Sequence, residues 1–116
     1  MRMMIAVVAL AATISITSAQ SVLLTGDTNC GTWIDGRTQR TAVALENFLE
    51  GLLNGMALTS MIEFWDRGGV RITKEQVFLW MDNYCRTNPH FNIYLGAMAI
   101  VNERTDGEWD RGWDRR

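Results

Sequence analysis

Two cysteines, Cys30 and Cys85, constrain this chain more than any other feature. They lie 55 positions apart in a chain of 116 residues. Joined to each other, they close a loop, and the entropy that this loop removes from the unfolded chain is worth about 4 kcal/mol. That is a large part of the ~5–15 kcal/mol that keeps a small domain folded. One histidine and no C-x-x-C motif argue against a zinc site, and we expect no metal or other cofactor.

The first 19 residues have the layout of a bacterial secretory signal peptide. Arg2 precedes an apolar run over 5–12, and Thr17 and Ala19 stand at the −3 and −1 positions of a cleavage site. The apolar run is too short to cross about 30 Å of hydrocarbon comfortably. The sequence therefore predicts a periplasmic or secreted protein that is not stably inserted in a membrane after cleavage. An uncleaved anchor is the alternative. Disulfides form in the predicted compartments.

The mature chain would begin at Gln20 and keep 97 residues, which is the size of one small domain. Loss of Arg2 changes the net charge from −2 to −3. Lys74 is the only lysine, and no basic stripe is present. Because phosphate binding needs clustered lysine and arginine, nucleic acid is not expected as a partner.

Residues 20–40 are rich in glycine, threonine, asparagine and aspartate, which predicts an extended lead-in with turns. Trp33 and Ile34 are its expected anchors in the core. From Thr41 onward, apolar residues recur every three or four positions, which predicts an amphipathic helix of five or six turns. A glycine pair at 68–69 then predicts a turn.

Two more helices are expected after this turn. Thr73 and Gln76 fit a capping box at the start of the second helix. Asn88 and Pro89 should end it and begin a third helix that runs to Arg104. The pattern predicts an all-α fold, a small single-domain bundle of three to four helices with one disulfide, over residues 41–105. The tail 106–116 carries many charges and no helical period, which predicts a flexible end.

Several surface features are candidate contacts. Gly51 and Gly55 lie four apart on the first helix, which predicts close packing of another helix there. Candidate contacts for a partner protein are two acidic residues of the same helix and two tryptophans of the tail: Glu46, Glu50, Trp109 and Trp113.

No catalytic residue is predicted. His90 has no serine or cysteine nucleophile paired with it by a recognisable local pattern. Phosphate loops, dinucleotide motifs and calcium loops are absent from the sequence. We expect a protein that is not an enzyme. A small hydrolase is kept as the third hypothesis because some exported helical domains are enzymes.

The order "CGTW", "NFLEGLLNGM", "ITKEQVFLWMDNYCRTNP" and "GAMAIV" over residues 30–104 resembles small exported bacterial proteins of the type VI secretion immunity group. These are periplasmic antagonists of peptidoglycan amidase effectors. The chain is also distantly similar to periplasmic acid-stress chaperones of the HdeA type, in size, helical content and one disulfide. The first cysteine lies before the long helix and the tail is rich in tryptophan, and in both points the chain departs from the immunity pattern.

The first resemblance implies a compact helical domain without catalysis that binds a toxin or effector enzyme and forms a homodimer. The alternative is a chaperone that exposes apolar helix faces when acid protonates its carboxylates. An adjacent gene for a cell-wall hydrolase would favour the first function. Protection of client proteins from aggregation at about pH 2 to 3, where carboxyl groups are protonated, would favour the second.

Overall fold

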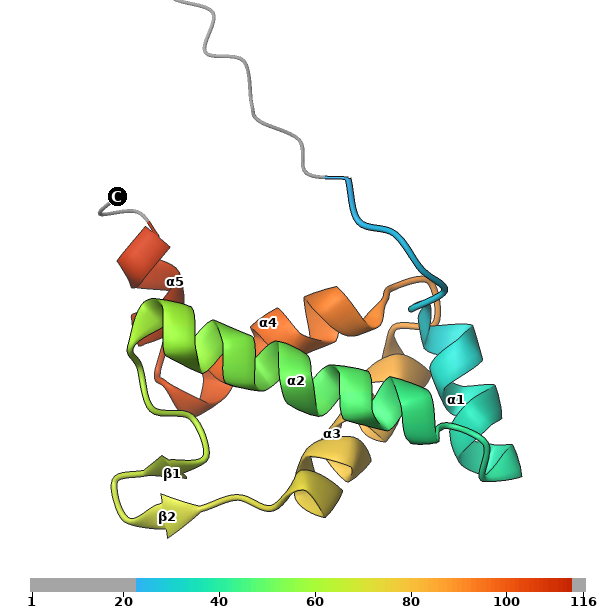
Figure 1. Ribbon diagram of the computed structural model, residues 1–116, viewed down its shortest axis with the longest axis horizontal. Coiled ribbons are helices and arrows are strands. Elements are labelled where there is room, and N and C mark those ends of the chain that lie inside the picture. The colour runs from blue at the N-terminus through green and yellow to red at the C-terminus, as the bar shows by residue number, and fades with distance from the viewer. Residues whose placement is uncertain (1–22, 114–116) are drawn as a thin grey trace, which may run out of the picture.

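Five α-helices and one β-hairpin follow each other within residues 23–113, the part of the chain that the computed structural model describes (Figure 1). The predicted signal peptide, 1–19, lies outside the described residues. The all-α fold is confirmed. In chain order the elements are α1 (Cys30–Gln39), α2 (Val43–Ser60), β1 (Asp66–Arg67), β2 (Val70–Arg71), α3 (Lys74–Thr87), α4 (Ile93–Arg104) and α5 (Glu108–Trp113).

Helix α1 corrects the prediction of an extended lead-in over 20–40. Its start is fixed by Asn29, whose side chain accepts a hydrogen bond from the backbone N–H of Thr32 at 2.8 Å. Only Cys30 and Trp33 are buried along its length, so the helix has no regular buried stripe. Tertiary contacts of these two side chains, rather than a helical period, therefore hold α1 in place.

The two predicted helices of the centre are confirmed as α2 and α3. Leu49 and Leu53 form the buried stripe of α2. Both hydrogen bonds of the capping box open α3, since Gln76 N–H donates to Thr73 Oγ1 at 3.2 Å and Thr73 N–H donates to Gln76 Oε1 at 2.8 Å. Between the two helices, Gly68 and Gly69 form the predicted turn, with φ of +61° and +77° that fit a two-residue hairpin loop.

Helix α4 begins later than predicted. Asn92, not Asn88, is its N-cap, and accepts a bond from Leu95 N–H at 3.0 Å. The residues before it form hydrogen bonds with the start of α1. Cys30 N–H donates to the Phe91 carbonyl at 2.9 Å, and Ile93 N–H donates to the Thr28 carbonyl. These bonds tie the start of α1 to the start of α4 and delay the helix.

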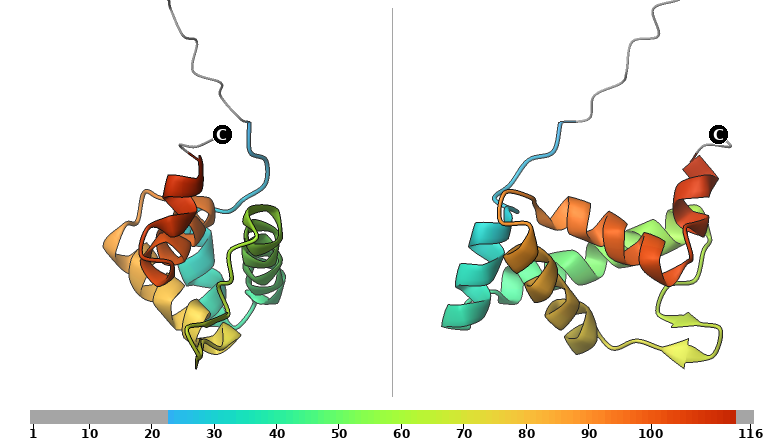
Figure 2. Two further views of the ribbon diagram at one scale, coloured as in Figure 1. Left: turned by 90° about the vertical axis from the view of Figure 1, so that its left-hand side faces the viewer. Right: turned by 180° about the vertical axis from the view of Figure 1, so that it is seen from behind.

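Helices α2 and α4 lie side by side and run in the same direction, and α3 crosses behind them (Figures 1 and 2). Helix α1 packs against α3 at one end of the molecule, and α5 packs against α4 at the other. All five helices contribute to the core, whose largest fully buried apolar side chains are Trp33, Leu49, Leu53, Phe64, Val77, Met81, Ile93 and Ile100.

The disulfide between Cys30 and Cys85 is confirmed. It joins the first residue of α1 to the last turn of α3, with the two Cα atoms 4.9 Å apart. Both cysteines are buried, with 0% and 1% of their surface exposed. The bond therefore holds the lead-in against the end of α3, as expected from the sequence.

The predicted packing of a helix on Gly51 and Gly55 is wrong for the described residues, 23–113. Both glycines are exposed, and a Cβ added at either would meet nothing within 4 Å. The close approach is instead at Gly96, where α4 meets α3. A Cβ there would lie 2.5 Å from Met81 Sδ and 3.0 Å from Tyr84 Cδ1.

The tail also differs from the prediction. Residues 108–113 form α5, and the Trp109 side chain is buried among the core residues. The chain reverses at Asp106 and Gly107, with φ of +50° and +75°, and Gly107 N–H donates to the carbonyl of Asn102 at 2.8 Å. Burial of one large aromatic ring on α4 orders this short segment. Residues 114–116 lie outside the described part.

We expect Gly96→Val to lower the free energy of unfolding by about 1–3 kcal/mol, the usual cost of overpacking a core. Met81 cannot move away freely because it is fully buried. Gly51→Val is the matched control, and should change stability by less than about 0.5 kcal/mol because its site is open. Urea denaturation of both variants measures the difference, and equal effects would contradict the assigned packing.

Candidate binding surface

No group of three or more histidine, cysteine, aspartate or glutamate side chains among residues 23–113 could hold a metal ion. His90 is exposed in the turn before α4. Within the same residues no helix is both long and apolar enough to cross a membrane.

The strongest polar cluster is centred on Asp82 of α3, which is 5% exposed. Its Oδ1 accepts hydrogen bonds from Trp33 Nε1 at 2.8 Å and from Arg37 Nε at 2.9 Å. Its Oδ2 accepts a third bond, from Arg37 Nη2 at 3.0 Å. The guanidinium also lies over the rings of Trp33 and Phe78, at 5.8 and 5.6 Å from their centroids. The buried charge of Asp82 is thus paired and hydrogen-bonded, and it connects α1 to α3.

Glu46 of α2 completes this cluster. Arg37 Nη1 donates to Glu46 Oε1 at 3.2 Å, so a single arginine links three helices. The pKa of Arg37 is raised above its ordinary value, first because of its hydrogen bonds to Asp82. A raised folded-state pKa stabilises the fold at every pH below the unfolded-state pKa, and this effect is lost only in strongly alkaline solution. The cluster therefore stays intact on the alkaline side of neutrality.

The structure separates the predicted partner contacts. Trp109 is buried in the core with 6% exposure, so the prediction is wrong for this residue. Glu46 is half-buried in an ion pair with Arg37, and its role as a partner contact stays a prediction. Glu50 is half-buried on α2 and can still border a contact surface. The Trp113 side chain lies outside what the structure describes.

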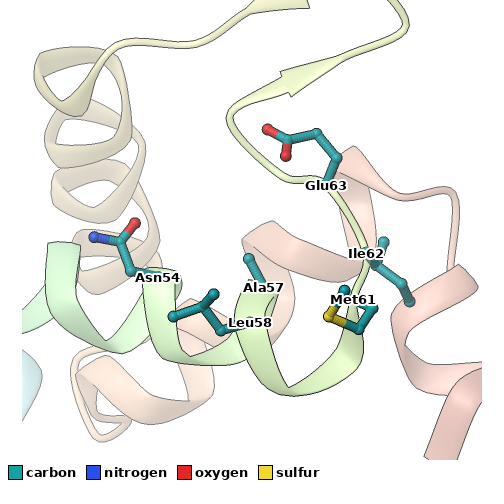
Figure 3. Close-up of a pocket in the computed structure, with 6 residues that line it drawn as sticks. All are labelled: Asn54, Ala57, Leu58, Met61, Ile62 and Glu63. Atoms are coloured by element: carbon teal, nitrogen blue, oxygen red, sulfur yellow. The ribbon is translucent and has the colours of Figure 1, made fainter.

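Large apolar side chains are instead exposed near the end of α2. Leu58 is 74% exposed, and Met61 directly after the helix is 86% exposed. They line a shallow depression of about 500 Å³ (Figure 3) together with Asn54, Ala57, Ile62 and Glu63. We call this set the Leu58 surface.

The Leu58 surface has a firm base. Trp65 Nε1 donates to Asn54 Oδ1 at 2.7 Å, which fixes the segment after α2 against the helix. Met61 has φ of +58°, and this left-handed cap turns the chain sharply at the end of α2. The depression is open and mostly apolar, which suits a protruding side chain of another protein better than an enclosed small molecule.

A second hollow, of about 250 Å³, lies beside the disulfide and is half the size of the first. Its lining includes both buried cysteines and Pro89. The disulfide fills a structural role there, and Asp35 and Arg86 are the charged residues of the lining.

The sequence contained a signal for the Leu58 surface that the prediction did not use. Leu58 lies about half a turn of the helix away from Leu49 and Leu53, and so cannot share their buried face. The Asp82 cluster had no such signal, because Asp82 lies 49 and 45 positions from its hydrogen-bond partners Trp33 and Arg37.

No protein-family model, curated protein or solved structure matches this chain. The resemblance to immunity proteins and to acid-stress chaperones therefore stays a prediction.

We expect Asp82→Asn to cost about 2–3 kcal/mol of stability. This is less than the ~3–5 kcal/mol for a fully buried pair, because the Arg37 side chain keeps 26% exposure. The amide still offers an oxygen to Trp33 but leaves the guanidinium without a charged partner. Thermal and urea unfolding measure the loss.

The matched control for this substitution is Asp66→Asn. Asp66 pairs with Arg71 on the hairpin, where their side chains are 46% and 78% exposed. We expect its loss to change stability by less than about 0.5 kcal/mol, as for other surface pairs. If both variants were equally stable, the Asp82 cluster would not be what holds α1 to α3.

Proposed function

We propose that this protein is a non-enzymatic, periplasmic or secreted binding protein that neutralises an exported enzyme acting on the cell wall. The observation that carries the proposal is the Leu58 surface, where two large apolar side chains stand out from an ordered fold. Exposure of large apolar side chains next to a rigid element is typical of protein contact sites. The disulfide is compatible with an oxidising compartment.

The chemistry of the Leu58 surface suits an inhibitor. Leu58 and Met61 provide an apolar contact, and methionine adapts its shape to a partner at little cost. Glu63 borders the same depression and Glu50 lies on α2, so the nearby charges are acidic. An acidic border speeds association with an enzyme whose substrate cleft is rimmed by basic residues.

A second candidate function, an acid-activated chaperone, rests on the Arg37 cluster. The cluster holds α1 through ion pairs of Arg37 with Asp82 and Glu46. Loss of these pairs would free the Trp33 and Phe78 rings to meet unfolded clients. Suppression of client aggregation at about pH 2 to 3, where carboxyl groups are protonated, tests this function.

The direct test of the first function uses the mature domain, residues 20–116 with its disulfide, and an exported cell-wall hydrolase encoded beside it. We expect a stable complex that blocks hydrolysis of peptidoglycan. Leu58→Glu should weaken binding by at least about 30-fold, the loss typical of a central contact residue. Calorimetry gives the affinity, and release of soluble wall fragments gives the inhibition.

Val70→Glu is the matched control, because Val70 is 64% exposed on the hairpin and lies outside the Leu58 surface. It should bind like the natural chain. Absence of binding at micromolar concentrations would contradict the proposed function. Equal losses for both variants would contradict the location of the contact.

A further inference from the structure

The methionines within residues 23–113 differ widely in their exposure to solvent. Met81 is fully buried, Met56 is half-buried, and Met98 is 42% exposed. Met61 is 86% exposed, which leaves its thioether sulfur open to reagents in solution. Because an exposed thioether is oxidised more readily than a buried one, Met61 is the methionine of this set that should react first.

The backbone at Met61 would suit a residue without a side chain. Its φ of +58° is left-handed, and glycine is the usual residue at a helix end of this kind. A residue with a Cβ atom is disfavoured in that conformation. Nor is Met61 among the described apolar side chains that pack on the core. The needs of the fold therefore do not account for a large apolar side chain at this position.

Met61 belongs to the Leu58 surface, where it lines the depression together with Leu58 and Ile62 (Figure 3). Glu63 lies at the same depression, and its Oε1 accepts a hydrogen bond from the backbone N–H of Asp66 at 2.8 Å. An ionised carboxylate only accepts hydrogen bonds, so it cannot pair with a further acceptor placed beside it. A polar oxygen on the Met61 sulfur would therefore find no partner in Glu63.

We propose that Met61 is a reversible oxidation site through which peroxide switches off binding at the Leu58 surface, an inference that rests on the proposed function. The Met61 sulfur attacks one oxygen of hydrogen peroxide, and the O–O bond breaks. That oxygen stays on the sulfur, which is oxidised to a sulfoxide, and the other leaves with both protons as water. The flexible apolar side chain becomes a polar one.

A sulfoxide at Met61 weakens the contact because its oxygen must leave water when the partner covers the Leu58 surface. Burial of a polar group without a hydrogen bond lowers affinity by about 10-fold to 100-fold. The change can be reversed, since methionine sulfoxide reductases act on this product and Met61 is exposed in the unbound protein. The surface can thus lose and regain its apolar contact while the core stays unchanged.

Peptide mass mapping of the mature, disulfide-bonded chain after timed exposure to hydrogen peroxide tests the site itself. We expect the mass of one oxygen atom to appear at Met61 at least about tenfold faster than at the buried Met81, and more slowly at Met98 than at Met61. The oxidised protein should keep its melting temperature, because Met61 lies outside the core. Oxidation of Met81 or Met98 before Met61 would overturn the proposal.

Calorimetry with the hydrolase, after catalase has removed the peroxide, tests the effect on binding. The oxidised chain should bind about 10-fold to 100-fold more weakly, and methionine sulfoxide reductases should restore its affinity. Met61→Leu should show the same affinity before and after peroxide treatment, whatever that affinity is. Met98→Leu is the matched control, because it removes an exposed methionine outside the Leu58 surface. It should lose affinity on oxidation as the natural chain does.

Unchanged affinity of the natural chain after oxidation of Met61 would overturn the proposal, and so would a sulfoxide that the reductases do not remove. Equal losses of affinity in Met61→Leu and the natural chain would overturn it too. Absence of a complex with the untreated chain would contradict the proposed function instead. In that case peptide mass mapping still decides whether Met61 is the site of reversible oxidation, so the two can fail independently.

Discussion

The fold depends on the attachment of α1 to α3 at two points. The disulfide fixes the first residue of α1, and Arg37 in its last turn is held by the buried carboxylate of Asp82. Trp33 lies between these points and is fully buried. Helix α1 has ten residues and no regular apolar stripe, so it would not persist in water without these contacts. The covalent link reduces the entropy of the unfolded chain, and the ionic cluster selects one orientation.

This attachment also explains how much of the fold could be predicted from the sequence. The period of Leu49 and Leu53 and the Thr73 cap are local signals, and the helices that they predicted are present. Helix α1 and α5 were missed because each is ordered by the tertiary burial of a tryptophan, Trp33 or Trp109. A local pattern carries no information on such long-range contacts.

The candidate site could be predicted less well than the fold. Acidic and aromatic residues were expected to contact a partner protein. In the structure, Glu46 forms an ion pair with Arg37, and Trp109 is buried in the core. The exposed side chains are Leu58 and Met61, and the position of Leu58 opposite the buried Leu49 and Leu53 was a local signal that the prediction did not use. Close packing of a helix was expected on Gly51 and Gly55, but no helix of residues 23–113 packs on them.

The measurement that tests this account most directly is the intact mass of the unreduced protein, before and after treatment with a reductant. Attachment of α1 through Cys30 and Cys85 predicts a chain that is lighter by two hydrogen atoms before reduction. Reduction should also lower the free energy of unfolding by about 4 kcal/mol. Two free thiols in the unreduced protein would contradict both the attachment and the proposed oxidising compartment.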